Sequence, residues 1–256
     1  MRTDLGGSDI AAEEHWGSAI TWLTLASGVM DLKIDLTVNQ RANYMCSAAW
    51  PYEDAQNATA SKVHLELTRL LYAYCAVESM TRAMDPTYGD DGKLVKHAKP
   101  IVSRYTGALP PHFLCIVDHL YDHCRDDPRL NRHNRLEESF QIPKGKISLP
   151  LQVGTQLRHL LAHGIFHLPP PDADSKGWKV GGANMTCTAQ KGTASLLMAA
   201  QTMLHVAYSE GNLGYDEEEI ELDDPVPTSG DEESWVSFVT PAEYLAASHL
   251  HLYGEL

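Results

Sequence analysis

The chain has 256 residues, of which 43% are hydrophobic, so it is long enough and apolar enough to bury a substantial core. These values exclude global disorder, and no stretch approaches the roughly 18 uninterrupted apolar residues that a membrane span needs. The formal net charge of −14 argues against a generally basic, nucleic-acid-binding surface. However, ten acidic residues gather in residues 216–233 and leave only −4 for the rest, so a local basic patch can still occur elsewhere.

The cysteine pattern and the start of the sequence bear on the cellular compartment. Five cysteines are an odd number and include no Cys-x-x-Cys pair, so the sequence indicates neither a disulfide framework nor a zinc knuckle. Residues 1–8 lack the basic and then apolar pattern of a secretion signal. We therefore expect a cytoplasmic protein that holds no structural metal and needs no cofactor.

The first 57 residues have the weakest periodicity, and we expect them to form an N-terminal extension. Residues 19–25 fit either a helix or a strand. Residues 31–38 alternate polar and apolar side chains, which favours a half-buried strand. The sequence therefore predicts a small β-containing region ahead of the helical part.

Three segments of the central region have the spacing of amphipathic helices. In residues 61–84, apolar side chains recur every three or four positions until Pro86 forbids continuation. Residues 111–126 follow the same spacing, with a proline in the first turn. A third helix is expected over residues 148–163, with Gly164 as its C-terminal cap.

The second half of the chain adds a hairpin and two more helices to the expected elements. A glycine pair within residues 178–187 suggests a hairpin or an irregular excursion. A fourth helix is expected over residues 193–209, followed by the acidic stretch as a solvated loop. A capping-box spacing then predicts a last helix over residues 240–253.

These elements predict a mainly α fold with three parts. Residues 1–57 are the extension, residues 58–210 a helical bundle with a short hairpin excursion, and residues 211–256 an acidic loop with a C-terminal helix.

Arg158 and His163 are the main candidates for chemistry. They are the one pair in the chain in which an arginine precedes a histidine by five positions, and they lie at the expected end of an amphipathic helix. Five residues on a regular helix place two side chains about 140° apart, so a shared cleft requires the helix end or a second copy of the helix. A histidine can move the proton of a ribose 2′-hydroxyl, and an arginine can hold the phosphate. The pair therefore suits metal-independent transphosphorylation of RNA.

The segment from Leu157 to Gly164, with the sequence Leu-Arg-His-Leu-Leu-Ala-His-Gly, resembles the R-x4-6-H motif of HEPN domains. His159 fills the polar position that often follows the arginine in this family, and the Ala-His-Gly ending is common there. Residues 70–80 also look like the earlier core helix of these domains. The resemblance covers about residues 58–210, of which about eight are specific.

The resemblance implies a HEPN-like helical bundle that forms a homodimer and brings two Arg-His pairs into one cleft. It implies an endoribonuclease whose products carry a 2′,3′-cyclic phosphate and a 5′-hydroxyl. It also implies a toxin, RNA-processing or phage-defence setting, with a possible neutralising or defence-system protein as partner and no membrane.

Other residues can assist the candidate pair. Glu78, among apolar neighbours on the helix expected over residues 61–84, could orient Arg158 or His163 across the bundle. The densest basic stretch could bind an RNA backbone, and its arginines are Arg125, Arg129, Arg132 and Arg135.

Each of these residues also has a structural interpretation. Arg158 can form a surface ion pair, and His163 can stabilise the negative end of the helix dipole. His159 and His163 are four residues apart and could form a metal-binding face, but no acidic ligand adjoins them. Glu78 and the basic stretch can simply be solvated. The alternative function is a non-catalytic helical module that binds a protein partner or a nucleotide.

Overall fold

The computed structural model describes residues 7–36, 50–89, 93–107, 111–125, 130, 145–162, 167–175 and 177–211. Within these ranges the chain is mainly α-helical, as the sequence predicts, and one small two-stranded sheet accompanies the helices. The chain divides into two compact units, Met1–Met203 and Leu204–Leu256, and the contacts described below lie within the first. No described helix is both long and apolar enough to cross a membrane.

The central element is the long helix α2 (Trp50–Met84). It begins well before residue 61, where the sequence places its start, because Pro51 and Glu53 suit a first helical turn. Its inner face buries residues at helical spacing, including Val63, Leu67 and Leu70. The helix ends at Met84, directly before Asp85 and Pro86, as expected from the proline.

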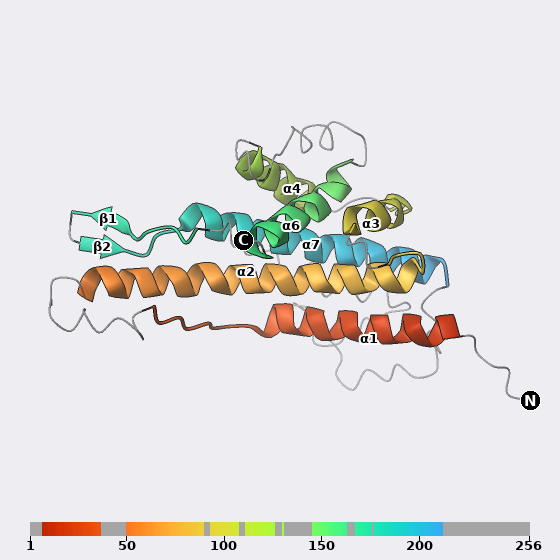
Figure 1. Ribbon diagram of the computed structural model, residues 1–256. Coiled ribbons are helices and arrows are strands. Elements are labelled where there is room, and N and C mark those ends of the chain that lie inside the picture. Colours follow the sequence, from red (N-terminus) through yellow and green to blue (C-terminus); the bar gives the residue numbers. More distant parts are fainter. Residues whose placement is uncertain are drawn as a thin grey trace, which may run out of the picture. The chain divides into compact units, whose positions relative to one another are not determined.

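Helix α1 (Gly7–Gly28) lies antiparallel along one side of α2 (Figure 1). The buried positions Ala19 and Ala26 carry small side chains, which allow the two helices to approach closely. The rings of Trp22 and Tyr72 meet with their centres 5.6 Å apart. Of the two structures that residues 19–25 permit, the helix is therefore the one adopted.

Residues 29–36 continue from α1 along α2 toward the N-terminal end of α2, and they form no strand. The guanidinium of Arg69 donates to the carbonyl of Val29 at 2.9 Å. The backbone N–H of Ile34 donates to the hydroxyl of Ser61, also at 2.9 Å. The strand expected over residues 31–38 is thus wrong for residues 31–36, because side chains of a helix take the backbone bonds that a neighbouring strand would take; residues 37–38 lie outside the described residues.

Three shorter helices lie on the side of α2 away from α1 (Figure 1). They are α3 (Leu94–Ser103), α4 (Pro111–Cys124) and α6 (Gly145–Ala162). Helix α3 packs on α2 and α6, and α6 packs on α2 and α4. Helices α4 and α6 confirm the sequence prediction to within a few residues at their ends, whereas α3 is not among the expected elements.

A hairpin and a long helix follow. Strands β1 (Asp172–Asp174) and β2 (Gly177–Lys179) pair antiparallel, with Ala173 opposite Trp178. A hairpin therefore exists, but it lies before the glycine pair and not within residues 178–187 as expected, and the helix expected from residue 193 already starts at Ala183. Helix α7 (Ala183–Ser209) begins there, since the backbone N–H and hydroxyl of Thr186 both donate to the carbonyl of Gly182. The helix expected over residues 240–253 lies outside the described residues.

Helix α7 packs closely on its neighbours within the first unit. A Cβ atom added at Gly192 would lie 2.8 Å from Leu70 Cδ1 on α2, and one at Gly154 of α6 would lie 3.0 Å from Leu196 Cδ1 on α7. These glycines allow α2, α6 and α7 to share one core.

Replacing Gly182 with alanine is expected to lower the free energy of unfolding by roughly 1 to 2 kcal/mol. Its φ of +73° disfavours any side chain, and a Cβ atom would lie 2.9 Å from Val63 Cγ2. The opposite result is expected for Gly17→Ala on α1, where a Cβ atom meets nothing within 4 Å and alanine raises helix propensity. Urea unfolding of both variants measures the difference, and a Gly182→Ala protein as stable as wild type would contradict the assigned backbone.

Candidate functional site

Arg158 is exposed on α6, four residues before the helix ends at Ala162. The same helix buries Leu151, Val153 and Leu157, which are at most 3% exposed. The guanidinium carbon of Arg158 lies 5.1 Å from the centre of the Tyr74 ring on α2, a cation–π contact. The apolar face of α6 therefore fixes the helix on the bundle, and Tyr74 holds Arg158 at the surface.

Tyr74 links Arg158 to the interior of the bundle. Its side chain is only 1% exposed. Burial raises the pKa of its hydroxyl, although a hydrogen bond with Thr155 and the charge of Arg158 act in the opposite direction. Tyr74 therefore stays neutral at physiological pH, so it contacts the guanidinium of Arg158 without neutralising its charge.

Glu78 lies one helical turn after Tyr74 on α2. Its carboxylate accepts a hydrogen bond from the hydroxyl of Tyr88 at 3.1 Å and pairs with Arg82 at 3.5 Å. The guanidinium of Arg82 also lies 4.9 Å from the centre of the Tyr88 ring. The charges of Glu78 and Arg158 both act on the pKa of Tyr74, so Glu78 shares the electrostatic environment of Arg158. Its hydrogen bonds nevertheless go to Tyr88 and Arg82.

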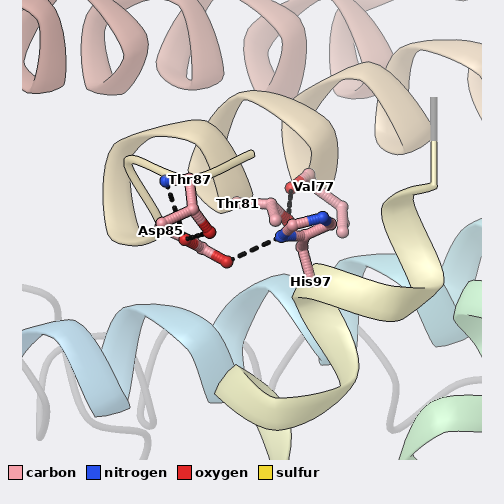
Figure 2. A network of polar contacts seen from close by, with 5 residues as sticks. All are labelled: Val77, Thr81, Asp85, Thr87 and His97. Carbon is pink, nitrogen blue, oxygen red and sulfur yellow. Dashed lines mark hydrogen bonds and ion pairs between the residues drawn. The ribbon is translucent and has the colours of Figure 1, made fainter. Parts of the chain in front are cut away.

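A second polar network joins the end of α2 to α3 (Figure 2). His97 Nδ1 of α3 lies 2.8 Å from Asp85 Oδ2. The other carboxylate oxygen of Asp85 accepts hydrogen bonds from the backbone N–H and the hydroxyl of Thr87. The ring of Tyr88 lies 5.0 Å from that of His97, and because Tyr88 also bonds to Glu78, the two networks are continuous.

The Asp85 pair makes stability depend on pH. The pKa of Asp85 lies below its ordinary value, first because the Thr87 hydroxyl donates to the carboxylate and also because of His97. A lowered folded-state pKa means that the stabilisation is complete above the unfolded-state pKa of about 3.9 and disappears as pH falls through the folded-state value.

Asp85→Asn is therefore expected to lower the free energy of unfolding by about 1 to 2 kcal/mol at pH 7. Its difference from wild type should shrink below about pH 4. Urea unfolding at several pH values measures this difference. Glu13→Gln, an exposed carboxylate on α1, is the control and should stay within about 0.5 kcal/mol of wild type. An Asp85→Asn difference that does not change with pH would contradict the pairing.

The structure describes two of the remaining candidate residues, His159 and Arg125. His159 is exposed on α6 beside Arg158 in the sequence. Arg125 is exposed after α4, and its guanidinium lies 3.4 Å from the carboxylate of Asp122. Four candidates lie outside the described residues: His163, Arg129, Arg132 and Arg135. The structure thus gathers Arg158 and Glu78 around Tyr74 and leaves the expected Arg158–His163 pair as a prediction.

The residues that sequence reasoning missed are the partners of the candidates. Tyr74, Tyr88 and His97 carry no local signal of their contacts, because each contact joins separate elements. The turn at Asp85 does carry one, since Asp-Pro-Thr is a sequence in which an aspartate side chain often bonds the backbone two residues later.

Chemically, the arrangement offers an exposed guanidinium with a fixed positive charge, suited to a phosphate or a carboxylate. Within the described residues, no three His, Cys, Asp or Glu side chains are grouped closely enough to hold a metal ion. Comparisons with known proteins add no assignment: no family model, no curated protein and no solved structure matches this chain.

Proposed function

We propose that this chain is a HEPN-like, metal-independent endoribonuclease in which Arg158 anchors the phosphate and His163 transfers the proton. The observation that carries the proposal is the placement of Arg158, exposed close to the end of α6 and held over the ring of Tyr74. His163 directly follows Ala162, the last described residue of α6. The two residues are five positions apart in the sequence.

The proposed reaction forms one bond and breaks one at phosphorus. The ribose 2′-oxygen attacks the adjacent phosphate and loses its proton to a histidine acting as general base. The 5′-oxygen of the next nucleotide leaves and takes a proton from a general acid. Arg158 stabilises the charge that develops on the phosphate oxygens. A homodimer would supply two copies of His163, one for each proton transfer.

Supporting roles follow from position. His159 is exposed next to Arg158 and is a candidate contact for the RNA near the phosphate. Glu78 contributes negative charge near Tyr74 and Arg158. Arg125, with Arg129, Arg132 and Arg135, is proposed to bind the RNA backbone. A toxin or phage-defence setting, with a neutralising or defence-system partner, remains part of the same proposal.

The proposal is tested by incubating wild type and His163→Ala with a mixed RNA pool in EDTA and detecting 2′,3′-cyclic phosphate ends. Cleavage by wild type alone is the expected result. A matched control is His15→Ala, which replaces a half-buried histidine of α1 and should cleave as wild type does. Absence of cleavage by a confirmed wild-type dimer on several kinds of RNA would contradict the proposal.

A second candidate function is a non-catalytic module that binds a protein partner or a nucleotide through the same surface. One observation favours it: Arg158 lies over Tyr74 much as Arg82 lies over Tyr88, at 5.1 and 4.9 Å, and Arg82 is paired within the fold. An arginine held in this way also suits an assembly surface. Equal RNA or nucleotide binding by wild type and His163→Ala, without cleavage, would favour this function.

A further inference from the structure

His123, at the end of α4, joins two side chains near the start of α7. Its Nε2 atom lies 3.6 Å from the sulfur of Cys187, and its Nδ1 atom lies 3.0 Å from Oδ1 of Asn184. Cys187 and Asn184 are three residues apart on α7, which places them on one face of that helix. A thiol, an imidazole and an amide thus form a continuous row between two helices.

The row has the order of an activated nucleophile, its base and the group that orients the base. An amide oxygen only accepts hydrogen bonds, so Asn184 Oδ1 keeps a proton on His123 Nδ1 and leaves Nε2 to accept the thiol proton. After that transfer the imidazolium donates from both nitrogens, to the amide oxygen and to the thiolate. The same arrangement therefore provides hydrogen bonds both when Cys187 is a thiol and when it is a thiolate.

The site can be reached from solvent. Asn184 is exposed, and Cys187 and His123 are each half-buried. The neighbouring charges include Lys191, one turn after Cys187 on α7, whose ammonium lies 3.5 Å from Nδ1 of His119 on α4. On the other side, Asp122 is paired with Arg125, at 3.4 Å.

We propose that Cys187 is a nucleophile activated by His123, with Asn184 as a positioning residue, and that it accepts acyl groups from small activated esters or thioesters. The thiolate attacks the carbonyl carbon, a C–S bond forms, and the bond from that carbon to the leaving oxygen or sulfur breaks. The proton that His123 took from the thiol goes to the leaving alkoxide or thiolate, so protons and electrons balance. Acyl donors suit this site because their leaving groups need the proton that the imidazolium holds.

This site is separate from the proposed ribonuclease site, since it uses none of the residues assigned to RNA cleavage. Either proposal can therefore fail without the other.

The test uses the full chain and p-nitrophenyl acetate as the probe. We expect one acetyl group per chain, located on Cys187 by peptide mass spectrometry, with release of one p-nitrophenol. At pH 6.5 the His123→Ala rate should be roughly a hundredfold lower than that of wild type. It should recover as pH rises through the ordinary thiol range near 8.5, which a merely structural role of His123 would not produce.

Two further variants complete the test. Asn184→Ala should lower the rate at pH 6.5 by roughly tenfold. Because this side chain is exposed, the variant can replace His123→Ala in the test if His123→Ala does not fold. Cys115→Ala removes an exposed thiol of α4 and should leave the rate unchanged. Acetylation of Cys115 in place of Cys187 would overturn the proposal. So would pH profiles of His123→Ala and Asn184→Ala that both match that of wild type. Oxidation of Cys187 by hydrogen peroxide without acetylation by the ester would overturn its acyl specificity.

Discussion

Arg158→Ala is expected to lower kcat/KM for RNA cleavage by roughly 100- to 1,000-fold. The guanidinium is the fixed positive charge at the end of α6, and a neutral Tyr74 holds it in place without cancelling that charge. Arg158→Lys should recover only part of the loss, because an ammonium group lacks the two-pronged geometry that matches a phosphate. The rate of appearance of 2′,3′-cyclic phosphate ends measures both effects.

The control for this prediction is Arg104→Ala, which removes an arginine that is exposed after α3. Its cleavage rate should equal that of wild type, so that general loss of positive charge does not explain the Arg158 result. Circular dichroism should show that both variants keep their helical content. Wild-type activity in Arg158→Ala would refute the role of the guanidinium.

Leu70→Ala is expected to cost about 2 to 5 kcal/mol of unfolding free energy. Leu70 is 1% exposed on α2, and Gly192 of α7 lies directly against its methyl groups. Truncation would leave a cavity between α2 and α7 that rigid helices cannot fully close. Urea unfolding measures the change.

The comparison residue for Leu70 is Ile20, an aliphatic side chain on α1 that is 65% exposed. Ile20→Ala should change the unfolding free energy by no more than about 0.5 kcal/mol. Equal effects of the two variants would mean that α2 and α7 do not share the core described above.

The helices with a clear apolar period could be predicted from sequence, and those without one could not. The face of α2 containing Leu67 and Leu70 has that period, and so do α4 and α6. Helix α1 buries mainly small residues such as Ala19 and Ala26, while its large apolar Ile20 is exposed, so its pattern is ambiguous. Helix α3 contains Pro100, which argues against a helix when no neighbour is known.

Two errors have a common physical cause, which is that tertiary contacts decided the structure of short segments. Residues 31–36 alternate as a strand would, but Ser61 and Asn57 of α2 bind their backbone. The Gly181-Gly182 pair looks like a turn, but Gly182 accepts the first hydrogen bonds of α7. In both segments the local sequence pattern is present, but it does not reveal which distant residues or which helix will bond to the backbone.

The candidate site also contains residues that the sequence can indicate and residues that it cannot. The sequence indicates Arg158 as a candidate because its motif is local. It also predicts a packed helix around Arg158, and in the structure Arg158 lies four residues before the end of that helix. It cannot identify Tyr74, since that ring reaches Arg158 only when α2 and α6 pack together. The same holds for His123 and Cys187, which are 64 residues apart in sequence.

The most direct test of the proposed chemistry is a single-turnover cleavage experiment in EDTA with a matched pair of RNA substrates. One is unmodified, and the other carries 2′-O-methyl groups at every nucleotide. The account predicts that wild type cleaves the first, leaves 2′,3′-cyclic phosphate and 5′-hydroxyl ends, and does not cleave the second. Cleavage of both substrates, or products with 3′-hydroxyl and 5′-phosphate ends, would contradict transphosphorylation through the 2′-hydroxyl.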